Sequence, residues 1–333
     1  MRHKAWMAIA GTALLLVGCG QQQPGSNGNA GGDAAAYPTA SVQLIAPAAP
    51  GGGWDSTARS MQAAIEADGL APEGVEVVNI AGAGGTIGLS QFVTRTDPNT
   101  LMVTGATLIG AIATNESTVS LDDIVPIARI TEEHHIVVVP ANSPFQNMGD
   151  LVNAMKADIG AVSIAGGSAG GTDQITAGLI AEAAGLDPSR VNYVAFSGGG
   201  ESLAALLGGQ VSAGISNVQE YLPQVQSGEL RALGVTSPER AEGVDIPTLT
   251  EQGIDVQFAN WRCILAPPNT TDEQASQVTA WLDTVHDSQA WQDAVKKNGW
   301  TDAYLTGADF QSFFDDQKTE IRATLTKLGL VKG

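Results

Sequence analysis

The chain of 333 residues is long enough for two domains of ordinary size, each with a core of its own. With 43% hydrophobic residues, only 5% aromatic residues and 40 glycines, its composition is typical of an α/β protein with many tight strand-to-helix turns. The formal net charge of −19 disfavours nucleic-acid binding and leaves no polybasic surface to hold the chain on a membrane.

The N-terminus has the pattern of an export signal. Arg2 and Lys4 precede the apolar run "AWMAIAGTALLLVG", which is too short to span a bilayer but suits secretion. The run ends in "LVGC", which resembles the lipobox of bacterial lipoproteins. We therefore predict a signal peptide over residues 1–18 and a lipid on Cys19, the first mature residue. The alternative is a chance cysteine near an ordinary cleavage site.

A flexible tether is predicted next, over residues 19–39. Its sequence "GQQQPGSNGNAGGDAAA" is rich in Gly, Gln, Asn and Ser and cannot form a core. If Cys19 is acylated, Cys263 has no partner for an internal disulfide, although the compartment would permit one. We expect Cys263 to be a buried, unreactive thiol.

A unit of strand, glycine-rich loop and helix recurs five times along the chain. In the first unit "VQLIAPAAPGGG" precedes "WDSTARSMQAAIEA", whose apolar positions 58, 61, 64 and 65 share one helical face. The other units cover residues 75–96, 99–115, 161–185 and 191–209. This alternation predicts parallel sheets covered by helices, with ligands bound beyond the carboxyl ends of the strands, where the glycine loops lie.

Two further strands are expected to cross between two lobes. The run "HHIVVVPANSP" leads out of a first lobe near Val139, and "GIDVQFANWRCILAPP" leads back into it. We therefore predict a discontinuous first lobe over residues 40–139 and 260–333, and an inserted second lobe over residues 140–259. Two crossings between two lobes make a hinge.

The glycine loops suit an anionic ligand. A helix N-terminus carries free N–H groups and a partial positive charge, and the bare Gly51, Gly52 and Gly53 would let a ligand approach them closely. For any one loop, a tight turn is the simpler explanation, but five such loops favour ligand binding. No G-x-x-x-x-G-K-[ST] motif occurs and none of these loops contains lysine, so a carboxylate fits better than a phosphate.

The stretch "GGSAG", residues 166–170, offers a competing enzymatic interpretation. It matches G-x-S-x-G between a predicted strand and a predicted helix, as a nucleophile elbow would. Ser168 would then need His286, the only downstream histidine, and no HGGG-type segment precedes it. His134 and His135 would face opposite sides of a strand and form a poor metal pair. We therefore expect no enzyme, no metal and no cofactor.

Taken together and in order, several segments resemble one known family. They are "PGGGWDSTAR", "GAGGTIGL", "DDIVPIARI", "AGGSAGGTDQ", "YVAFSGGGESLAALLGGQV", "GELRALGVTSPER" with "PTLTEQG", and "NWRCILAPP" with "KNGW". Over residues 41–330 the chain is similar to the extracytoplasmic solute-binding proteins of tripartite tricarboxylate transporters, including the Bug-type receptors. The resemblance implies a two-lobed periplasmic-binding-protein fold that closes on a carboxylate held by backbone amides and water.

Carried over position by position, the resemblance also implies the ligand-binding residues. They come from the first loop (Gly52, Gly53, Asp55 and Ser56), from the second loop (Gly84, Gly85 and Thr86) and from the inserted lobe (Ser168, Gly171, Thr172, Asp173, Ser197, Gly198, Ser216 and Asn217). Trp54 would wall the pocket or pack beside the hinge. Asp55 would cap its helix or orient a bridging water. Arg262 would meet a second carboxylate or form a hinge salt bridge. Relatives usually have glycine after this "WR", and Cys263 stands there instead.

The predicted function is that of a lipid-anchored receptor. It captures a small organic di- or tricarboxylate and presents it to a two-component membrane permease, closing when the ligand bridges both lobes. We expect a monomer that binds no nucleic acid and meets the membrane through the lipid on Cys19. A ligand sensor for a membrane kinase is the alternative with the same binding chemistry, and a serine hydrolase is the remote one.

Overall fold

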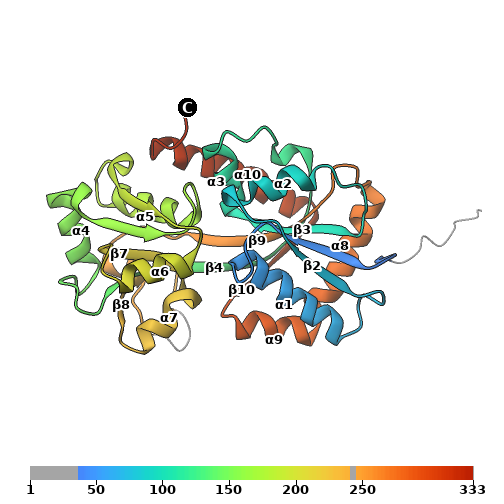
Figure 1. Cartoon of the computed structure of the whole chain (residues 1–333), viewed down its shortest axis with the longest axis horizontal. Coiled ribbons are helices and arrows are strands. Elements are labelled where there is room, and N and C mark those ends of the chain that lie inside the picture. Colours follow the sequence, from blue (N-terminus) through green and yellow to red (C-terminus); the bar gives the residue numbers. More distant parts are fainter. Residues whose placement is uncertain (1–36, 241–244, 333) are drawn as a thin grey trace, which may run out of the picture. The chain divides into compact units, whose positions relative to one another are not determined.

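The structure, a computed structural model, describes residues 37–240 and 245–332 (Figure 1). The predicted signal peptide, Cys19 and the predicted tether up to residue 36 lie outside the described residues. Within these two described ranges, none of the helices combines the length and the apolar composition that crossing a bilayer requires.

The first group of elements repeats the order predicted from the sequence. It contains β1 (Val42–Ala46), α1 (Gly53–Ala67), β2 (Val75–Asn79), α2 (Thr86–Phe92), β3 (Thr100–Gly105) and α3 (Ala106–Thr114). Every residue of β3 is buried, as expected for a strand covered on both faces. Helix α1 turns Ala58, Met61, Ala64 and Ile65 inward, so the predicted apolar face is confirmed.

The second group follows the long strand β4 (Val125–Pro140). It contains α4 (Met148–Ala157), β5 (Ser163–Gly166), α5 (Thr172–Ala183), β6 (Asn192–Ala195), α6 (Gly199–Leu207), β7 (Ala213–Asn217), α7 (Val218–Gln226) and β8 (Leu230–Val235). The two units predicted here are confirmed as β5–α5 and β6–α6. A sixth unit, β7–α7, was not predicted, because no glycine-rich loop separates its strand from its helix.

The chain then returns through β9 (Ala259–Ala266) to the first group. There it adds α8 (Asp272–Asp287), α9 (Gln289–Lys297), β10 (Thr301–Thr306) and α10 (Gly307–Lys327). A capping box of Thr271 and Gln274 starts α8, and the Ser288 hydroxyl accepts a hydrogen bond from Trp291 at the start of α9. Single 3₁₀ turns lie at Ala83–Gly85, Leu121–Asp123, Ile159–Ala161, Pro188–Arg190 and Thr250–Gln252.

The described strands form one mixed sheet rather than purely parallel sheets. Their order is β2-β1-β3-β9-β4-β7-β5-β6, with β8 and β10 also paired to β4. Pairs β1–β2, β1–β3, β5–β6 and β5–β7 are parallel as predicted, whereas β4 and β9 run antiparallel to all their neighbours. Because β9 brings the chain back along the path by which β4 left, these two strands must run in opposite directions.

Strand β4 belongs to both groups. Up to His134 it pairs with β9, and from His135 onward it pairs with β7 and then β8. In Figure 1, β4 and β9 are the strands that pass between the two groups. The predicted lobe boundaries at residues 139/140 and 259/260 stay predictions.

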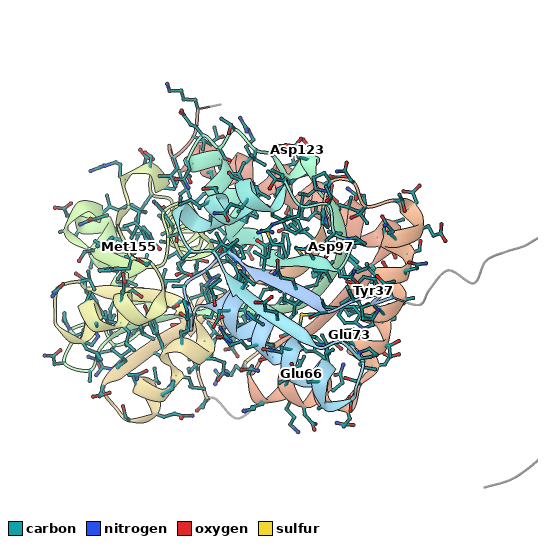
Figure 2. The ribbon with its side chains drawn as sticks, turned by 45° about the vertical axis from the view of Figure 1, so that its right-hand side comes forward. Tyr37, Glu66, Glu73, Asp97, Asp123 and Met155 are labelled. Atoms are coloured by element: carbon teal, nitrogen blue, oxygen red, sulfur yellow. The ribbon has the colours of Figure 1, made fainter. Side chains whose placement is uncertain are left out.

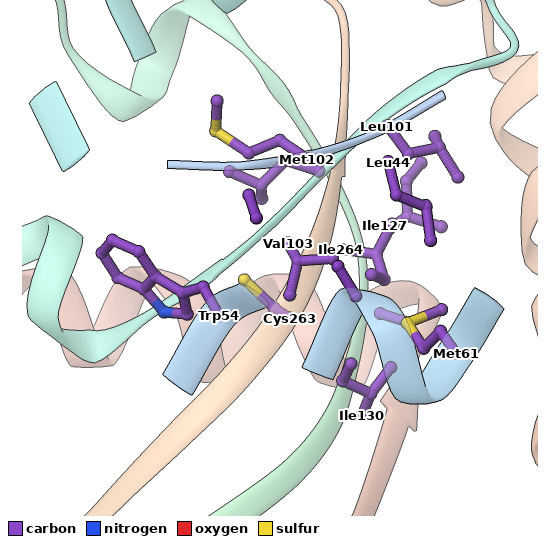
Figure 3. Close-up of a cluster of buried hydrophobic side chains, with 14 of the residues drawn as sticks. Leu44, Trp54, Met61, Leu101, Met102, Val103, Ile127, Ile130, Cys263 and Ile264 are labelled. Carbon is purple, nitrogen blue, oxygen red and sulfur yellow. The ribbon is translucent and has the colours of Figure 1, made fainter. Parts of the chain in front are cut away.

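Separate hydrophobic clusters stabilise the two groups. The first cluster packs Leu44, Met61, Val103 and Ile264 among residues of α8 to α10 (Figure 3). Two smaller clusters involve the second group, one around Val137 and the other around residues 136 and 138. Successive side chains of β4 thus point to opposite faces of the sheet, as they do in any β-strand. Cys263 is free and fully buried in the first cluster, as predicted, and burial raises the pKa of its thiol.

Helix α5 of the second group packs directly against the first group. Ile175 belongs to the first cluster, and a Cβ atom added to Gly178 would overlap the side chain of Leu328. At the edge of this contact, Lys327 Nζ lies 2.9 Å from Glu182 Oε1. The two groups therefore touch along α5, α10 and the chain just beyond α10.

Several of the acidic side chains that make the chain negative lie at its surface. Figure 2 shows Glu66, Glu73, Asp97 and Asp123 at the surface of the first group, and all four are exposed.

Candidate functional site

The first glycine loop, between β1 and α1, is held by Asp55. One carboxylate oxygen accepts the Gly51 N–H at 2.8 Å and the Arg59 Nε–H at 3.0 Å, while the other accepts from Asn79 Nδ2 at 2.8 Å. The side chain is only 2% exposed. Burial raises the pKa of Asp55, but the hydrogen bonds from Gly51, Arg59 and Asn79 outweigh it and hold the pKa below the ordinary value. Asp55 thus shapes the loop and keeps its charge.

The three glycines of this loop are needed by the protein itself. Gly51 has a φ of +84°, a conformation that favours glycine. A Cβ atom on Gly53 would come within 2.9 Å of a guanidinium nitrogen of Arg262. Arg262 therefore makes the close approach at Gly53, and the prediction that this bare backbone also receives a ligand stays a prediction.

Arg262 lies under this loop in a buried ion pair. Its Nη2 donates to Glu133 Oε2 of β4, and its Nη1 donates to the Thr57 hydroxyl of α1 at 2.8 Å. The guanidinium also stacks over Trp300 at 5.2 Å from the ring centre. Arg262 thus forms a buried salt bridge between β9 and β4, whereas the predicted hinge and the predicted contact with a second carboxylate stay predictions.

The second glycine loop, between β2 and α2, has an unusual backbone. Ala83, Gly84 and Gly85 have φ values of +48°, +62° and +96°. A Cβ atom on Gly84 would come within 2.5 Å of Ala111 and 3.9 Å of the Ser168 Cβ, and one on Gly85 would meet the Trp54 ring at 2.8 Å. The loop is thus pressed between Trp54, α3 and the second group.

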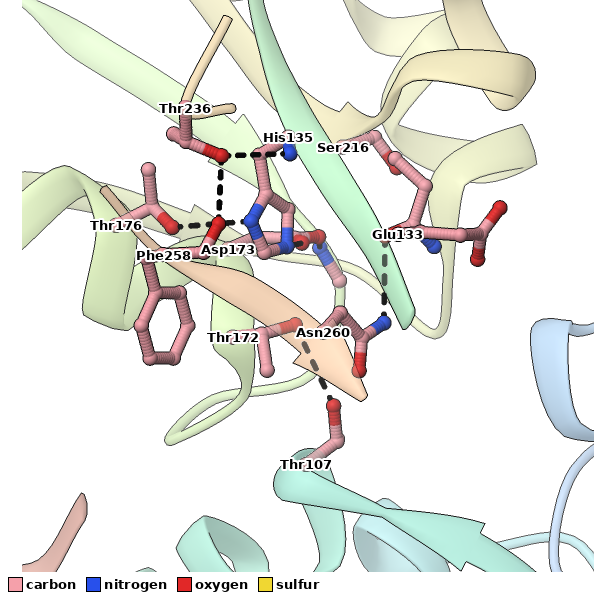
Figure 4. Close-up of polar contacts among 12 residues, drawn as sticks. Thr107, Glu133, His135, Thr172, Asp173, Thr176, Ser216, Thr236, Phe258 and Asn260 are labelled. Carbon is pink, nitrogen blue, oxygen red and sulfur yellow. Dashed lines mark hydrogen bonds and ion pairs between the residues drawn. The ribbon is translucent and has the colours of Figure 1, made fainter. Parts of the chain in front are cut away.

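The loop between β5 and α5 is fixed by Asp173. Its Oδ2 accepts the Gly167 N–H at 2.7 Å, and its Oδ1 lies 3.1 Å from His135 Nε2 (Figure 4). His135 is fully buried on β4, and its Nδ1 lies 3.2 Å from the Thr176 hydroxyl. Asp173 therefore does for this loop what Asp55 does for the first.

Two further loops border the same end of the second group. At the start of α6 the Ser197 N–H donates to Glu201 Oε2 at 3.1 Å. At the end of β7 the Ser216 hydroxyl donates to Glu220 Oε2 at 2.5 Å. The next residue, Asn217, accepts from Asn260 Nδ2 of β9 at 3.3 Å, which links this loop to the crossing strand.

The structure brings loops and helix starts of the two groups together. Thr107 Oγ1 at the start of α3 and Thr172 Oγ1 at the start of α5 are 3.5 Å apart (Figure 4). The Gly84 loop borders Ser168, as described above. Sequence reasoning placed no ligand-binding residue in the β3–α3 loop, although "VTGAT" has the same strand, glycine and hydroxyl order as the loops it did select.

Among the described residues, helices of both groups have unpaired N–H groups in their first turns. In the described ranges no acceptor lies within hydrogen-bond reach of the first-turn N–H groups of α1, residues 53–55, or of α5, residues 172–174. Such groups and the helix dipole together suit an anion. The nearby carboxylates of Asp55 and Asp173 are already hydrogen-bonded, so they do not compete for these donors.

The hydrolase alternative finds no support in the geometry. His286 Nε2 lies 2.9 Å from Asp302 Oδ2, its Nδ1 lies 3.2 Å from Asp287 Oδ1, and its ring stacks on Tyr304. Both imidazole nitrogens are therefore engaged on the first group, away from Ser168. Within the described part of the chain, no cluster of three or more His, Cys, Asp or Glu side chains could hold a metal ion.

Parallel strand-loop-helix units on either side of two crossing strands give the chain the fold of the two-lobed periplasmic binding proteins. Residues 58–330 match the family described as the tripartite tricarboxylate transporter family receptor. The chain belongs to this family, and the resemblance inferred from the sequence is confirmed. The family is one of extracytoplasmic substrate-binding receptors, not enzymes.

Individual relatives are distant but cover most of the chain. Protein BugT of Bordetella pertussis is 27% identical over 292 residues, or 84% of this chain and 87% of BugT. The structure of MatC from Rhodopseudomonas palustris with bound malate is similar with a TM-score of 0.72 and 22% identity, over 87% of this chain and 100% of MatC. Another Rhodopseudomonas palustris protein, solved with adipate, has a TM-score of 0.76 and 21% identity, over 88% of this chain and 98% of its own.

Proposed function

We propose that the protein captures a small organic di- or tricarboxylate outside the cytoplasm and delivers it to a two-component membrane permease. The observation that carries this proposal is the approach of the N-termini of α3 and α5 from the two groups, with Thr107 Oγ1 and Thr172 Oγ1 3.5 Å apart. Membership of the receptor family supports it. Malate and adipate, bound by the two Rhodopseudomonas palustris proteins, belong to the proposed class of ligand.

The proposed binding residues divide into donors and supports. Backbone N–H groups and hydroxyls would receive the ligand carboxylate at Gly52, Gly53, Ser56, Gly84, Gly85, Thr86, Ser168, Gly171, Thr172, Ser197, Gly198, Ser216 and Asn217. Trp54 walls the second loop, while Asp55 and Asp173 hold the loop backbones in place. Arg262 acts on the hinge through Glu133. The lobes, divided at residues 139/140 and 259/260, would close on the ligand as a monomer.

Calorimetric titration of the full chain in detergent, freed of bound ligand by reversible unfolding, tests this proposal. We expect saturable one-to-one binding of at least one acid among citrate, tricarballylate, succinate, malate, aspartate and adipate. Binding should be lost for the methyl ester of that acid, because an ester lacks the charge that the helix N-termini recognise. Equal affinity for acid and ester, or no binding of any of these acids, would contradict the proposal.

We also propose that a lipid on Cys19 anchors the protein to the membrane. Because Cys19 ends the "LVGC" segment, Cys19→Ser should abolish incorporation of labelled palmitate and move most of the protein from the membrane fraction to the soluble one. Cys263→Ser is the control: its thiol is fully buried, so membrane attachment should not change. Unchanged labelling and fractionation of the Cys19→Ser variant would rule the anchor out.

A further inference from the structure

Glu220 differs from the other carboxylates around the glycine loops. The others each accept from a backbone N–H or a basic side chain: Asp55 from Gly51 and Arg59, Asp173 from Gly167, Glu201 from Ser197, and Glu133 from Arg262. In the described ranges, Glu220 receives a hydrogen bond only from the Ser216 hydroxyl. Like the exposed Glu201, it has spare acceptor capacity and no ion-pair partner, but it is half-buried.

Glu220 lies where the proposed ligand would meet the second group. It is in the first turn of α7, directly beyond Ser216 and Asn217 at the end of β7. Its Oε2 occupies the position that a Cβ atom on Gly199 would take, so the start of α6 also borders it. The side chain is half-buried and lies between two of the loops proposed to bind the ligand.

The surroundings of Glu220 favour a hydrogen-bond donor. Burial, helped by the nearby charges of Asp173 and Glu133, raises the pKa of Glu220, and it outweighs the hydrogen bond from Ser216 and the charge of Arg262, which lower it. A half-buried carboxylate is stabilised when a donor or a cation meets it. A second acceptor borders the same end of β7, because Asn260 Oδ1 is buried and has no hydrogen-bond partner in the described part of the structure.

We propose that Glu220 determines ligand specificity by accepting a hydrogen bond from an amino or hydroxyl group of the bound acid. The proposal rests on the carboxylate binding proposed above and narrows its ligand class to amino- or hydroxy-substituted acids. An unsubstituted acid leaves Glu220 without that donor. A ligand that places a further carboxylate next to Glu220 brings two negative charges together, which disfavours its binding. Sites built to hydrogen-bond a ligand group reject analogues that lack the group.

Matched acids that differ only in the donor test this proposal. The full chain in detergent, stripped of ligand, is titrated with succinate, malate and aspartate, and with tricarballylate and citrate. We expect the best substituted acid of at least one set to bind about tenfold or more tightly than its unsubstituted partner, as one hydrogen bond to a charged group allows. Aspartate as the best ligand would identify an ammonium as the donor, and malate or citrate a hydroxyl.

Two variants then show whether Glu220 causes the preference. Glu220→Gln keeps an acceptor but loses the charge, so it should weaken mainly the preference for aspartate. Glu220→Met removes the acceptor and should reduce the affinity ratio in every set to about one. Glu229→Gln removes an exposed carboxylate of the same group and should leave all ratios unchanged. Because each ratio compares two ligands on one variant, a general loss of stability cancels.

The outcomes separate this proposal from the proposed function. Equal affinity for substituted and unsubstituted acids on the unaltered chain, or a preference that survives Glu220→Met, would overturn the role of Glu220 and leave carboxylate binding intact. Binding of adipate alone would overturn the role of Glu220 only, and no binding of adipate or of any of the five acids would overturn both.

Discussion

Replacing Arg262 by methionine should lower the free energy of unfolding by about 3–5 kcal/mol. The Arg262 side chain is 2% exposed and donates to Glu133, which is 6% exposed, so removing the guanidinium leaves a buried carboxylate without a cation. The Thr57 hydroxyl loses its donor in the same step. Methionine fills much of the volume of the arginine side chain. The loss of stability therefore comes from the lost charge and hydrogen bonds more than from a cavity.

A second substitution shows that the charge is responsible. Adding Glu133→Gln to the Arg262→Met variant should recover most of the lost stability, because no buried charge then remains. The measurement is urea unfolding of the two single variants and the double variant, followed by far-UV circular dichroism and analysed as a double-mutant cycle.

Arg240→Met is the matched control for this cycle. Arg240 is 46% exposed and pairs with Glu251 and Asp245 at the surface, so its loss should change the free energy of unfolding far less than the loss of Arg262 does. A double variant no more stable than Arg262→Met alone would show that the ion pair is not what Arg262 contributes. A loss of affinity confined to dicarboxylates, with unchanged stability, would instead restore its alternative role as a ligand contact.

The repeated strand-loop-helix units could be predicted because their signals are local. Apolar residues at the spacing of α1 and the glycines before it lie within about 25 consecutive residues, and the helix formed where expected. The β7–α7 unit has the same architecture but was missed, since Asn217 ends the strand and Val218 begins the helix with no glycine between them. Without a glycine-rich turn the sequence showed no sign of this unit, although the family resemblance named its residues Ser216 and Asn217 as ligand-binding.

The pairing of the crossing strands could not be predicted in the same way. Thr131 and Arg262 are neighbours across β4 and β9, yet they lie more than a hundred positions apart in the chain. Alternating strands and helices predicted parallel pairs, which hold within each group, but nothing local shows that the return strand lies beside β4. The sequence also located only the end of β4, because its first part, "VPIARITEE", mixes charged and apolar residues.

The role of the loop glycines was only partly predictable for the same reason. Their position before helices was clear, and so was the idea that bare backbone allows a close approach. What approaches depends on distant residues: Arg262 at Gly53, Trp54 and Leu108 at Gly85. These glycines shape the loops whose free N–H groups are proposed to bind the ligand, so packing and binding are complementary roles.

The second large effect is expected at Gly110, where the two groups meet. A Cβ atom on Gly110 of α3 would overlap the carbonyl oxygen of Gly170, in the loop before α5. We expect Gly110→Ala to weaken ligand binding by about tenfold to a hundredfold, because overpacking typically costs 1–3 kcal/mol and 1.4 kcal/mol is a factor of ten in affinity. Calorimetry with the ligand identified above measures this loss.

The free energy of unfolding of the ligand-free Gly110→Ala variant should change by less than about 1 kcal/mol. If the groups are lobes joined at β4 and β9, the open form separates α3 from the Gly170 loop and removes the overlap. The substitution then acts on the closing equilibrium alone, and a ligand must supply the added cost of closure. Gly200→Ala is the control: it lies in helix α6, and a Cβ atom there meets no atom within 4 Å.

Unfolding and binding data together distinguish a closing contact from permanent packing. If α3 contacts the Gly170 loop in both the open and the closed form, Gly110→Ala strains the two forms equally. The balance between the two forms is then unchanged. Affinity would then be unchanged while the free energy of unfolding falls by 1–3 kcal/mol. That result would place the moving surfaces elsewhere and contradict closure at α3. Weaker binding with unchanged unfolding can arise only if opening separates these two backbones, because a contact present in every folded state cannot shift the balance between them.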